Sequence, residues 1–290
     1  MTGTGERGVG GLPRRFTKMS GAGNDFLVFD ERVDVGPQET ATIRRLCERG
    51  RGVGADGVLF LVAVPGGGVP IVVADYYNAD GGPARFCANG TRCAARFGSL
   101  RLGTGIELTV RTGWGDIGAT VHPDAQVTLR LPEPVAVGEE LPTFDPDEVL
   151  VERTGVAVSV GVPHIVVFTS GRTGLDQIDL APVAPRMRHH PALPDGANVH
   201  FVAPASRGRL AIRSWERGVE GETLACGSGV VAAAVVAASR DGIAPPVTVE
   251  TRSGENLVVD FRLDGGVARD VTLTGDARVV FEGTLNEEIL

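Results

Sequence analysis

Two short segments of this 290-residue chain place a thiol at the start of an expected helix. They are Cys87-Ala-Asn-Gly90 and Cys226-Gly-Ser-Gly229, each followed by a run dominated by small or apolar residues. Asn and Ser are favoured N-caps because their side-chain oxygens accept free amides of the first turn. A thiol before that turn faces unpaired N–H groups and the positive end of the helix dipole, which favours the thiolate. The same amides can hold a carboxylate, so the repeat predicts two thiols acting on one anionic substrate.

The structural alternative for one such segment is a cysteine that only fills space, since free cysteine is among the most buried residue types. Two copies, each opening a helix, favour the catalytic interpretation. Cys93 lies inside the first expected helix, and Cys47 lies in the arginine-rich run 43–51. We therefore expect Cys93 and Cys47 to be structural.

Several other chemistries are disfavoured by composition. Lys18 is the only lysine, and no glycine-rich phosphate cradle with an acidic partner lies near it, which argues against pyridoxal phosphate. The five histidines lack the spacing of a zinc site, so we expect neither a cofactor nor a metal. The formal net charge of −8 argues against a nucleic-acid partner.

The composition also predicts a globular chain, with 42% hydrophobic and 22% charged residues. The segment Met1 to Leu12 is glycine-rich and lacks the apolar centre of a signal peptide. No run approaches the roughly 18 apolar residues of a membrane span. Four cysteines do not make a disulfide framework, so we expect a reduced, cytoplasmic protein without membrane contact.

The elements that must position the two cysteines follow a repeated plan of short strands and one helix. We expect helices from about Gly90 to Phe97, ending at Gly98, and from Gly229 to about Arg240, ending at Gly242. The second helix is apolar on all sides and therefore belongs inside the protein. A buried helix wrapped by strands, twice over, predicts an α/β (α+β) fold of two similar domains, each with a mixed sheet around a central apolar helix. The cysteines would meet at the cleft between the domains.

The expected domain boundaries follow from this plan. The N-terminal domain covers residues 14–131 and includes a returning C-terminal strand within 276–290, and the C-terminal domain covers 132–275. The segment Pro132 to Phe144 is the expected linker, and a short helix is expected near Pro146 to Thr154.

The chain closely resembles the diaminopimelate epimerase family, in motifs that occur in family order from residue 16 to the C-terminus. A lone Gly-x-Gly-Asn-Asp would be a weak signal, but the ordered set covers nearly the whole chain. The matching segments are Phe16–Phe26, Gly52–Gly57, Tyr77–Gly81, Cys87–Gly90, Gly161–His164, Asn198–Val199, Glu216–Gly218, Glu222–Gly229 and Thr274–Gly275.

The resemblance implies a cofactor-independent isomerase with two pseudo-symmetric domains, expected to be a homodimer. Cys87 and Cys226 would lie on opposite faces of the substrate α-carbon and convert LL-2,6-diaminopimelate to the meso form for lysine and cell-wall synthesis. Inversion needs a base on one face and an acid on the other, so one cysteine starts as thiolate and the other as thiol. Loss of the α-proton builds charge on the carboxylate, which backbone donors at Ala88, Asn89, Gly227 and Ser228 would stabilise.

The family also implies partners for the thiols and for the distal end of the substrate. His164 would tune Cys87 and Glu216 would tune Cys226; the structural alternatives are a core histidine and a surface ion pair. Substrate contacts are implied at Asn24, Asn78, Asn198, Glu216 and Arg217. Because neighbouring strand residues point to opposite faces, Glu216 and Arg217 can both serve only if the strand bends, which Gly218 permits.

Four positions depart from the commonest family pattern. Gly57 stands where many members have Gln, and Val162 replaces an Asn before the Pro-His pair. Ala88 replaces a Gly, which matters if that position needs a positive φ, and the loop Gly218–Gly221 carries one residue more. These departures concern substrate recognition, whereas both thiols are retained.

Three alternatives stay open at this point. A two-thiol racemase of another amino acid, such as histidine or a hydroxyproline, is disfavoured by Arg217, because a shorter substrate needs no clamp for a distal carboxylate. A thiol redox protein without racemase activity would turn over peroxide or disulfide substrates and exchange no α-proton. A catalytically inactive binding module is disfavoured by the intact cysteines in both halves.

Overall fold

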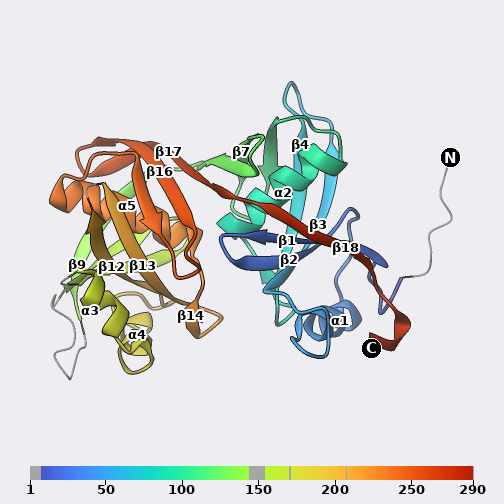
Figure 1. The fold of residues 1–290 in the computed structure, drawn as a ribbon, viewed down its shortest axis with the longest axis horizontal. Coiled ribbons are helices and arrows are strands. Elements are labelled where there is room, and N and C mark those ends of the chain that lie inside the picture. Colours follow the sequence, from blue (N-terminus) through green and yellow to red (C-terminus); the bar gives the residue numbers. More distant parts are fainter. Residues whose placement is uncertain (1–7, 144–153, 170, 207, 290) are drawn as a thin grey trace. The chain divides into compact units, whose positions relative to one another are not determined.

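The structure is a computed structural model that describes residues 8–143, 154–169, 171–206 and 208–289. The chain divides into two compact units, residues 1–129 with 276–290, and residues 130–275. Both are mixed α+β units built mainly of strands (Figure 1), which confirms the predicted fold class. The short helix expected near Pro146 to Thr154 falls on residues outside the described part, except that Thr154 begins a strand.

The first unit is one mixed sheet with α2 packed against it. Its strands pair in the order β18, β1, β2, β3, β4, β6 and β7, with β5 added to β4. The elements are β1 (Arg15–Gly21), β2 (Asn24–Phe29), α1 (Pro37–Cys47), β3 (Gly57–Val64), β4 (Ile71–Asn78), β5 (Pro83–Ala84), α2 (Ala88–Arg101), β6 (Glu107–Arg111), β7 (Asp116–Val121), β8 (Gln126–Arg130), β18 (Arg278–Thr284) and the 3-10 turn η1 (Glu287–Ile289).

The second unit encloses α5 within its strands (Figure 1). The pairing runs β9, β10, β11, β12, β13, β15, β16 and β17, and β17 pairs back to β9, which closes the ring. The elements are β9 (Val135–Pro142), β10 (Thr154–Ser159), β11 (Pro163–Phe168), α3 (Arg172–Gln177), α4 (Leu180–Arg188), β12 (Asn198–Ser206), β13 (Arg209–Glu216), β14 (Gly221–Thr223), α5 (Gly227–Asp241), β15 (Val247–Glu250), β16 (Asn256–Asp264) and β17 (Val267–Asp276).

The two units repeat one pairing scheme. In each, an antiparallel pair (β1–β2, β10–β11) leads to a parallel neighbour (β3, β12), then to an antiparallel strand (β4, β13) and a short edge strand (β5, β14). A helix (α2, α5) follows, and the chain returns parallel to β4 or β13 through β6 or β15. Each cysteine segment therefore enters its helix at the same point of an equivalent unit.

The helix boundaries correct one prediction and confirm another. Helix α2 runs through Gly98 to Arg101, so Gly98 does not end it as expected. A Cβ on Gly98 would lie 2.6 Å from Cγ2 of Val72, so this glycine permits close packing of helix on strand. Helix α5 does end at Gly242, which adopts the left-handed conformation (φ 65°), and its residues Val230–Ala238 are buried as predicted.

The expected linker is wrong in part, because Val135–Pro142 forms β9. Val135 and Leu141 are buried, and β9 pairs with both β10 and β17, so this segment completes the sheet of the second unit. No helix in the described part of the chain is long and apolar enough to cross a membrane.

Candidate active site

Cys87 is the N-cap of α2. Its backbone is extended (φ −143°, ψ 111°), and its Sγ accepts the amide of Gly90 at 3.4 Å. The half-buried thiol therefore lies at the positive end of the helix dipole, where a thiolate is favoured. Asn89 was the expected cap, but it is the second residue of the helix, because the cysteine sulfur occupies the cap position.

Cys226 occupies the same position on α5. It is the N-cap, with extended backbone (φ −113°, ψ 105°), and it is 4% exposed. Its Sγ lies 3.6 Å from Oγ of Ser228, the residue expected to cap the helix, which is instead its second residue. Both cysteines therefore replace Asn and Ser as caps, and the predicted repeat of thiol and helix start is present in both units.

The four amides expected to hold a carboxylate belong to the first two residues of the helices, Ala88, Asn89, Gly227 and Ser228. The first amides of a helix have no intrahelical carbonyl to bond to, which is why helix starts can hold an anion. Ala88 lies in regular helix, where φ is negative, so the replacement of glycine by alanine causes no backbone strain here.

A chain of polar side chains supports the start of α2. Asn89 donates to Oδ1 of Asn24 at 2.6 Å, and Asn24 donates to Oδ2 of Asp56 at 2.9 Å. Arg92, fully buried, donates to Oδ1 of Asn89 at 2.8 Å and to the backbone oxygen of Asp276 at 3.1 Å. Two predicted substrate contacts, Asn24 and Asn89, are thus joined to each other on this unit.

Lys18 belongs to an ion-pair network and is 6% exposed. Its Nζ lies 2.7 Å from Oδ2 of Asp25, which also pairs with Arg49 at 2.6 Å. Burial would raise the pKa of Asp25, but hydrogen bonds from Arg49 and Lys18 outweigh it and lower the pKa. The only lysine of the chain is therefore held in a structural ion pair.

Asn78 and Gly57 face each other at the end of the β3–β4 pair. Asn78 is the exposed last residue of β4, and its backbone closes a turn with Gly82 at 2.9 Å. A Cβ on Gly57 would lie 2.6 Å from the ring of Tyr76 and 2.6 Å from the carbonyl oxygen of Tyr77. The Tyr76 ring thus fills the space beside Gly57.

Arg217, Glu216 and Asn198 lie together at the end of β13. Oδ1 of Asn198 accepts the amide of Arg217 at 2.8 Å, and the Arg217 guanidinium donates to the backbone oxygen of Asp195 at 3.1 Å. Glu216 accepts a 2.5 Å hydrogen bond from Oγ1 of Thr223. The strand ends at Glu216 and Gly218 is left-handed (φ 88°), so the chain bends at the place where Glu216 and Arg217 need a bend in order to serve one site.

His164 is fully buried on β11 and belongs to a hydrogen-bonded chain. Its Nδ1 lies 2.9 Å from Nε2 of His200, whose Nδ1 lies 2.9 Å from Oγ of Ser214. Burial lowers the pKa of His164 to about 3 and that of His200 well below its ordinary value, so both rings are neutral. Ligand atoms of His164, His200 and Cys226 all lie within 4.8 Å of one another, the one such group of metal-ligand type in the described residues.

The remaining cysteines, which were expected to be structural, are both buried. Cys47 is 5% and Cys93 0% exposed, and burial raises the pKa of Cys47 to about 12 and that of Cys93 further. Neither thiol is activated.

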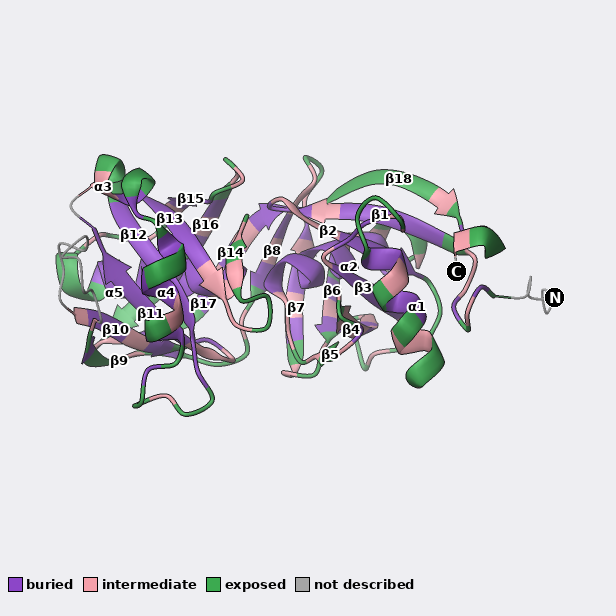
Figure 2. Ribbon diagram, turned by 90° about the horizontal axis from the view of Figure 1, so that it is seen from below, coloured by how far each residue is buried: buried purple, intermediate pink, exposed green. Residues whose placement is uncertain are grey.

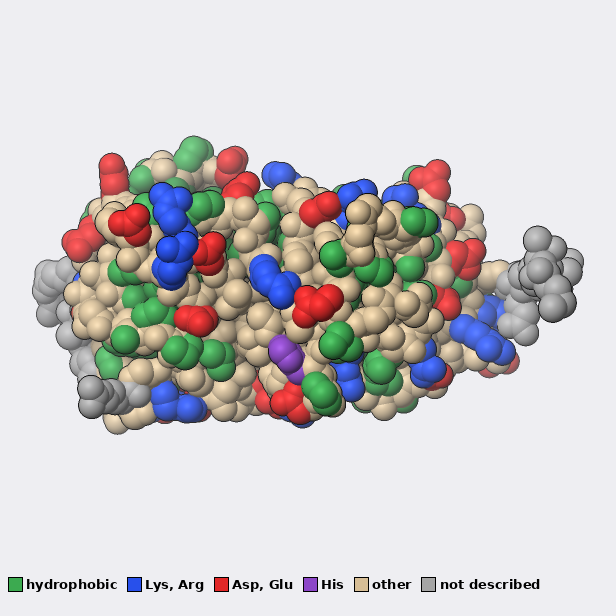
Figure 3. Space-filling view, turned by 90° about the horizontal axis from the view of Figure 1, so that it is seen from above, with side chains coloured by type: hydrophobic (Ala, Val, Ile, Leu, Met, Phe, Trp, Pro, Cys, Tyr) green, Lys and Arg blue, Asp and Glu red, His purple; other side chains and the backbone are tan. Residues whose placement is uncertain are grey.

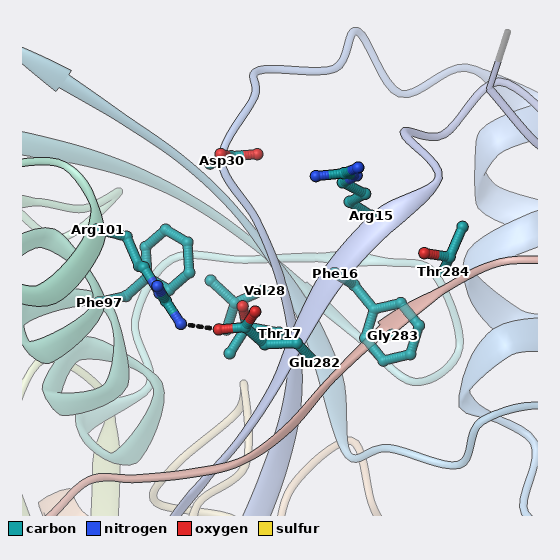
Figure 4. A pocket seen from close by; sticks show the side chains of 10 residues that line it. All are labelled: Arg15, Phe16, Thr17, Val28, Asp30, Phe97, Arg101, Glu282, Gly283 and Thr284. Atoms are coloured by element: carbon teal, nitrogen blue, oxygen red, sulfur yellow. Dashed lines mark ion pairs between the residues drawn. The ribbon is translucent and has the colours of Figure 1, made fainter. Parts of the chain in front are cut away.

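A hollow of about 420 Å³ on the first unit lies away from the predicted site. Arg101 and Glu282 form an ion pair across it, and Phe16 and Phe97 line its sides (Figure 4). None of the predicted site residues lines it. On the face drawn in Figure 3, acidic and basic side chains of the described residues are interspersed rather than gathered by sign.

Five residues that contact or support predicted site residues were not predicted from the sequence. Arg92 carried a signal, because a charged residue amid small and apolar neighbours of an expected helix needs a buried partner. Asp56 also carried a signal, because it lies in the family-like segment Gly52–Gly57. The others carried none, because only strand pairing brings them beside the site. They are Tyr76, His200 and Ser214.

Known proteins match the chain over almost its full length. A family model described as diaminopimelate epimerase matches residues 16–137 and 156–280. Curated relatives of that name include one from Aquifex aeolicus, 37% identical over 95% of this chain and 99% of the relative. Another, from Synechococcus sp. strain JA-2-3B'a(2-13), is 38% identical over 93% of this chain and 97% of the relative.

Solved structures of more distant proteins share the fold. A probable proline racemase from Agrobacterium radiobacter K84 has a TM-score of 0.68 at 16% identity, covering 94% of this chain and 93% of that one. A hydroxyproline epimerase from Agrobacterium vitis has a TM-score of 0.65 at 16% identity, covering 94% and 92%. At such identities the likeness concerns the fold alone.

Proposed function

This chain belongs to the diaminopimelate epimerase family, and we propose that it converts LL-2,6-diaminopimelate to the meso form with Cys87 and Cys226 as its two acid–base groups. The enzyme is an isomerase. The observation that carries the assignment of the cysteines is the repeated helix start, in which each thiol is the N-cap of the helix at the same point of an equivalent unit.

The reaction needs one thiolate and one thiol. The thiolate removes the α-proton, so an S–H bond forms as the C–H bond breaks, and the electron pair is delocalised into the α-carboxylate. The other thiol then donates its proton to the opposite face of the carbon. The enzyme ends with the two protonation states exchanged, and no electrons are gained or lost.

The amides at the two helix starts would stabilise the intermediate. Negative charge grows on the carboxylate during proton removal, and the backbone N–H groups of Ala88, Asn89, Gly227 and Ser228 are donors fixed before the reaction begins. The helix dipoles act in the same direction.

The distal amino-acid head would be recognised by charged and amide side chains. Arg217 offers a forked pair to the distal carboxylate, and Glu216 offers a partner to its ammonium group. Asn24, Asn78 and Asn198 complete this proposed set, with Asn198 also holding the backbone of Arg217. Within the same proposal His164 tunes Cys87 and Glu216 tunes Cys226.

Exchange of the α-proton tests the proposal. Incubation with LL-diaminopimelate in heavy water should give meso product that carries α-deuterium in the NMR spectrum. Cys87→Ala and Cys226→Ala should each abolish epimerisation, whereas Lys18→Arg should keep most of it. Full activity of either alanine variant would rule out the two-base mechanism, and turnover of peroxide without α-exchange would favour the redox alternative.

A second experiment asks whether the two thiols reach the same carbon. Mild oxidation without substrate should couple Cys87 to Cys226, since a disulfide forms only when the Cα atoms come within about 7 Å. Mass spectrometry should find the coupled peptide, and bound substrate should suppress it. If oxidation never joins these two cysteines, a shared site is wrong.

We also propose a cytoplasmic homodimer in which β18 contributes to the interface. This strand pairs with β1, and Val280 and Phe281 on it are 56% and 46% exposed (Figure 2). Val280→Lys and Phe281→Glu should shift the sedimentation coefficient to that of a monomer. Val69→Lys, at a residue 48% exposed on the loop between β3 and β4, is the matched control and should leave the sedimentation coefficient unchanged.

A further inference from the structure

We propose that His200 is a positioning residue that fixes the tautomer of His164, keeping the His164 proton on Nε2, and that Ser214 fixes His200 in turn. The effect on turnover rests on the function proposed above, whereas the effect on the imidazole protons does not.

The three side chains form a continuous buried chain. His164 and His200 are 0% exposed and Ser214 is 2% exposed. The separations are 2.9 Å from Nδ1 of His164 to Nε2 of His200, and 2.9 Å from Nδ1 of His200 to Oγ of Ser214. Strand pairing fixes the geometry, since His200 on β12 lies opposite Ser214 on β13 in the register, and β11 with His164 runs parallel to β12.

In a chain of two neutral imidazoles and one hydroxyl, the hydrogen bonds can all be donated in one direction or all in the other. In one, Ser214 donates to His200, and His200 donates from Nε2 to Nδ1 of His164, which leaves the His164 proton on Nε2. In the other, every hydrogen bond is reversed and His164 presents an unprotonated Nε2. The hydrogen bond made by one ring nitrogen therefore decides what the other nitrogen can do.

The surroundings of His164 favour the first direction. The backbone carbonyl of Val160 interacts with the ring and opposes the fall in its pKa. A carbonyl only accepts, and Nδ1 is already engaged by His200, so the carbonyl favours a proton on Nε2. Nε2 makes no well-formed hydrogen bond to the described residues. An N–H at Nε2 therefore meets no better acceptor than this carbonyl among the described residues, and the ligand atom of Cys226 lies within 4.8 Å of that of His164, where a thiolate could accept it.

His200 is held in place by the helix that carries Cys226. A Cβ added to Gly229 would lie 2.1 Å from Cε1 and 2.5 Å from Nε2 of His200, so the ring packs directly on the first turn of α5. This contact leaves the imidazole no room to turn, and it places the chain beside the second thiol. Packing thus fixes the orientation of the ring, and its hydrogen bonds to His164 and Ser214 fix the tautomer.

The test is ¹⁵N NMR of the histidine rings, which separates protonated from unprotonated nitrogens. Wild-type enzyme should show His164 protonated on Nε2 and unprotonated on Nδ1. His200→Leu should move the His164 proton at least partly to Nδ1, whereas His200→Gln, which keeps a donor near the place of Nε2, should preserve the wild-type pattern. His122→Gln is the control, because His122 lies in the other unit and pairs with Thr128 at 2.9 Å.

Turnover gives the second readout. His200→Leu should lower kcat by about tenfold to a hundredfold, the range typical of groups that orient functional histidines, with little change in KM. His200→Gln should recover most of that loss. Wild-type His164 protonated on Nδ1, or His164 signals unmoved by His200→Leu in a folded protein, would overturn the proposal. Absence of epimerase activity in the wild-type protein would instead refute the proposed function, and the NMR result on the histidine protons would still hold.

Discussion

The two units repeat one scaffold but carry different side chains at equivalent positions beside their cysteine helices. Register defines the equivalence: Phe26 lies opposite Gly57 as His164 lies opposite Asn198. Tyr76 likewise lies opposite Leu59, as Ser214 lies opposite His200. In the first unit these three positions hold apolar and aromatic side chains, Phe26, Leu59 and Tyr76. In the second unit the same positions hold a hydrogen-bonded polar chain, His164, His200 and Ser214.

The comparison distinguishes the features that both units share through their common fold from the side chains that differ between them. The helix start, with its backbone amides and its cysteine at the N-cap position, is common to both units. In the first unit, Phe26 and Tyr76 make an edge-to-face aromatic contact with ring centroids 6.0 Å apart. In the second, the ends of the corresponding strands carry His164 and Arg217. At these three register-equivalent positions only the second unit carries a hydrogen-bonded polar chain, so substitutions there toward the first unit's residues measure what that chain contributes.

The largest effect is expected at the end of β13, where Arg217 follows the strand as Ala79 follows β4. Arg217→Ala makes the second unit like the first and leaves the distal carboxylate without its forked partner. Truncating one side of such a charge pair costs about 2–5 kcal/mol, so kcat/KM for diaminopimelate should fall by roughly a hundredfold or more.

Part of this loss should appear in kcat, because remote binding energy helps to position the reacting carbon. Arg188→Ala removes a cation that pairs with Glu220 on the same unit and serves as the control for loss of charge. An Arg217→Ala enzyme as active as wild type, or efficient racemisation of a monocarboxylic amino acid, would overturn the substrate assignment.

The next effect concerns the equivalent glycines Gly90 and Gly229. A Cβ at Gly229 would lie 2.1 Å from His200, whereas the nearest atoms at Gly90 lie 3.6 Å away, on Phe26 and Cys87. Gly229→Ala should therefore lower the free energy of unfolding by about 1–3 kcal/mol through overpacking. Gly90→Ala should leave it unchanged or raise it, because alanine is the better helix former.

Urea denaturation of both variants measures the difference. The double variant Gly229→Ala/His200→Ala should regain stability, since the small side chain removes the clash. Equal stabilities for Gly90→Ala and Gly229→Ala would show that the His200 ring does not pack on α5 as described.

How much the sequence predicts depends on the range of the interaction. The cysteine helix starts were predicted because the signal is local, although the cap proved to be the cysteine itself. Gly98 was misread because a terminating glycine and a packing glycine look alike until Val72 is placed beside it. The pairing of His164 with His200 was not predicted, because it depends on the register of β11 and β12, which no local pattern fixes. Gly57 was recognised as a departure, but the Tyr76 ring that fills its space lies on another strand.

A pH effect follows from the histidines that replace Phe26 and Leu59 in the second unit. The pKa of His164 falls from about 6.5 in the unfolded chain to about 3 in the fold because the ring is buried. Between these values the unfolded state binds more protons, so stability is lost as pH falls below 6.5. At pH 5 His164 alone should cost about 2 kcal/mol relative to pH 7.

Denaturation of wild type and His164→Phe at pH 7 and pH 5 isolates the contribution of His164 to the free energy of unfolding, because the carboxylates titrate equally in both proteins. The wild type should lose more stability than the variant over this interval. An equal loss would mean that His164 is protonated in the folded state or exposed to solvent.

The smallest effect concerns the turns that follow β4 and β13, residues 79–82 and 217–220. In the first turn Gly81 adopts a positive φ (81°) without strain, whereas in the second Glu220 does so (φ 53°). Glu220 is held there by Arg188 at 2.9 Å and by the amide of Gly218 at 3.1 Å. Its side chain is 48% exposed, so the ion pair should contribute no more than about 1 kcal/mol.

Glu220→Ala loses these bonds and keeps the strained backbone, whereas Glu220→Gly loses the same bonds but relieves the strain. Glu220→Gly should therefore be the more stable variant by about 1 kcal/mol, and kcat/KM of both should stay within about twofold of wild type, since neither touches Arg217 or a thiol. Thermal unfolding of the two variants decides the point, and an alanine variant more stable than the glycine variant would show that Glu220 does not need the left-handed conformation.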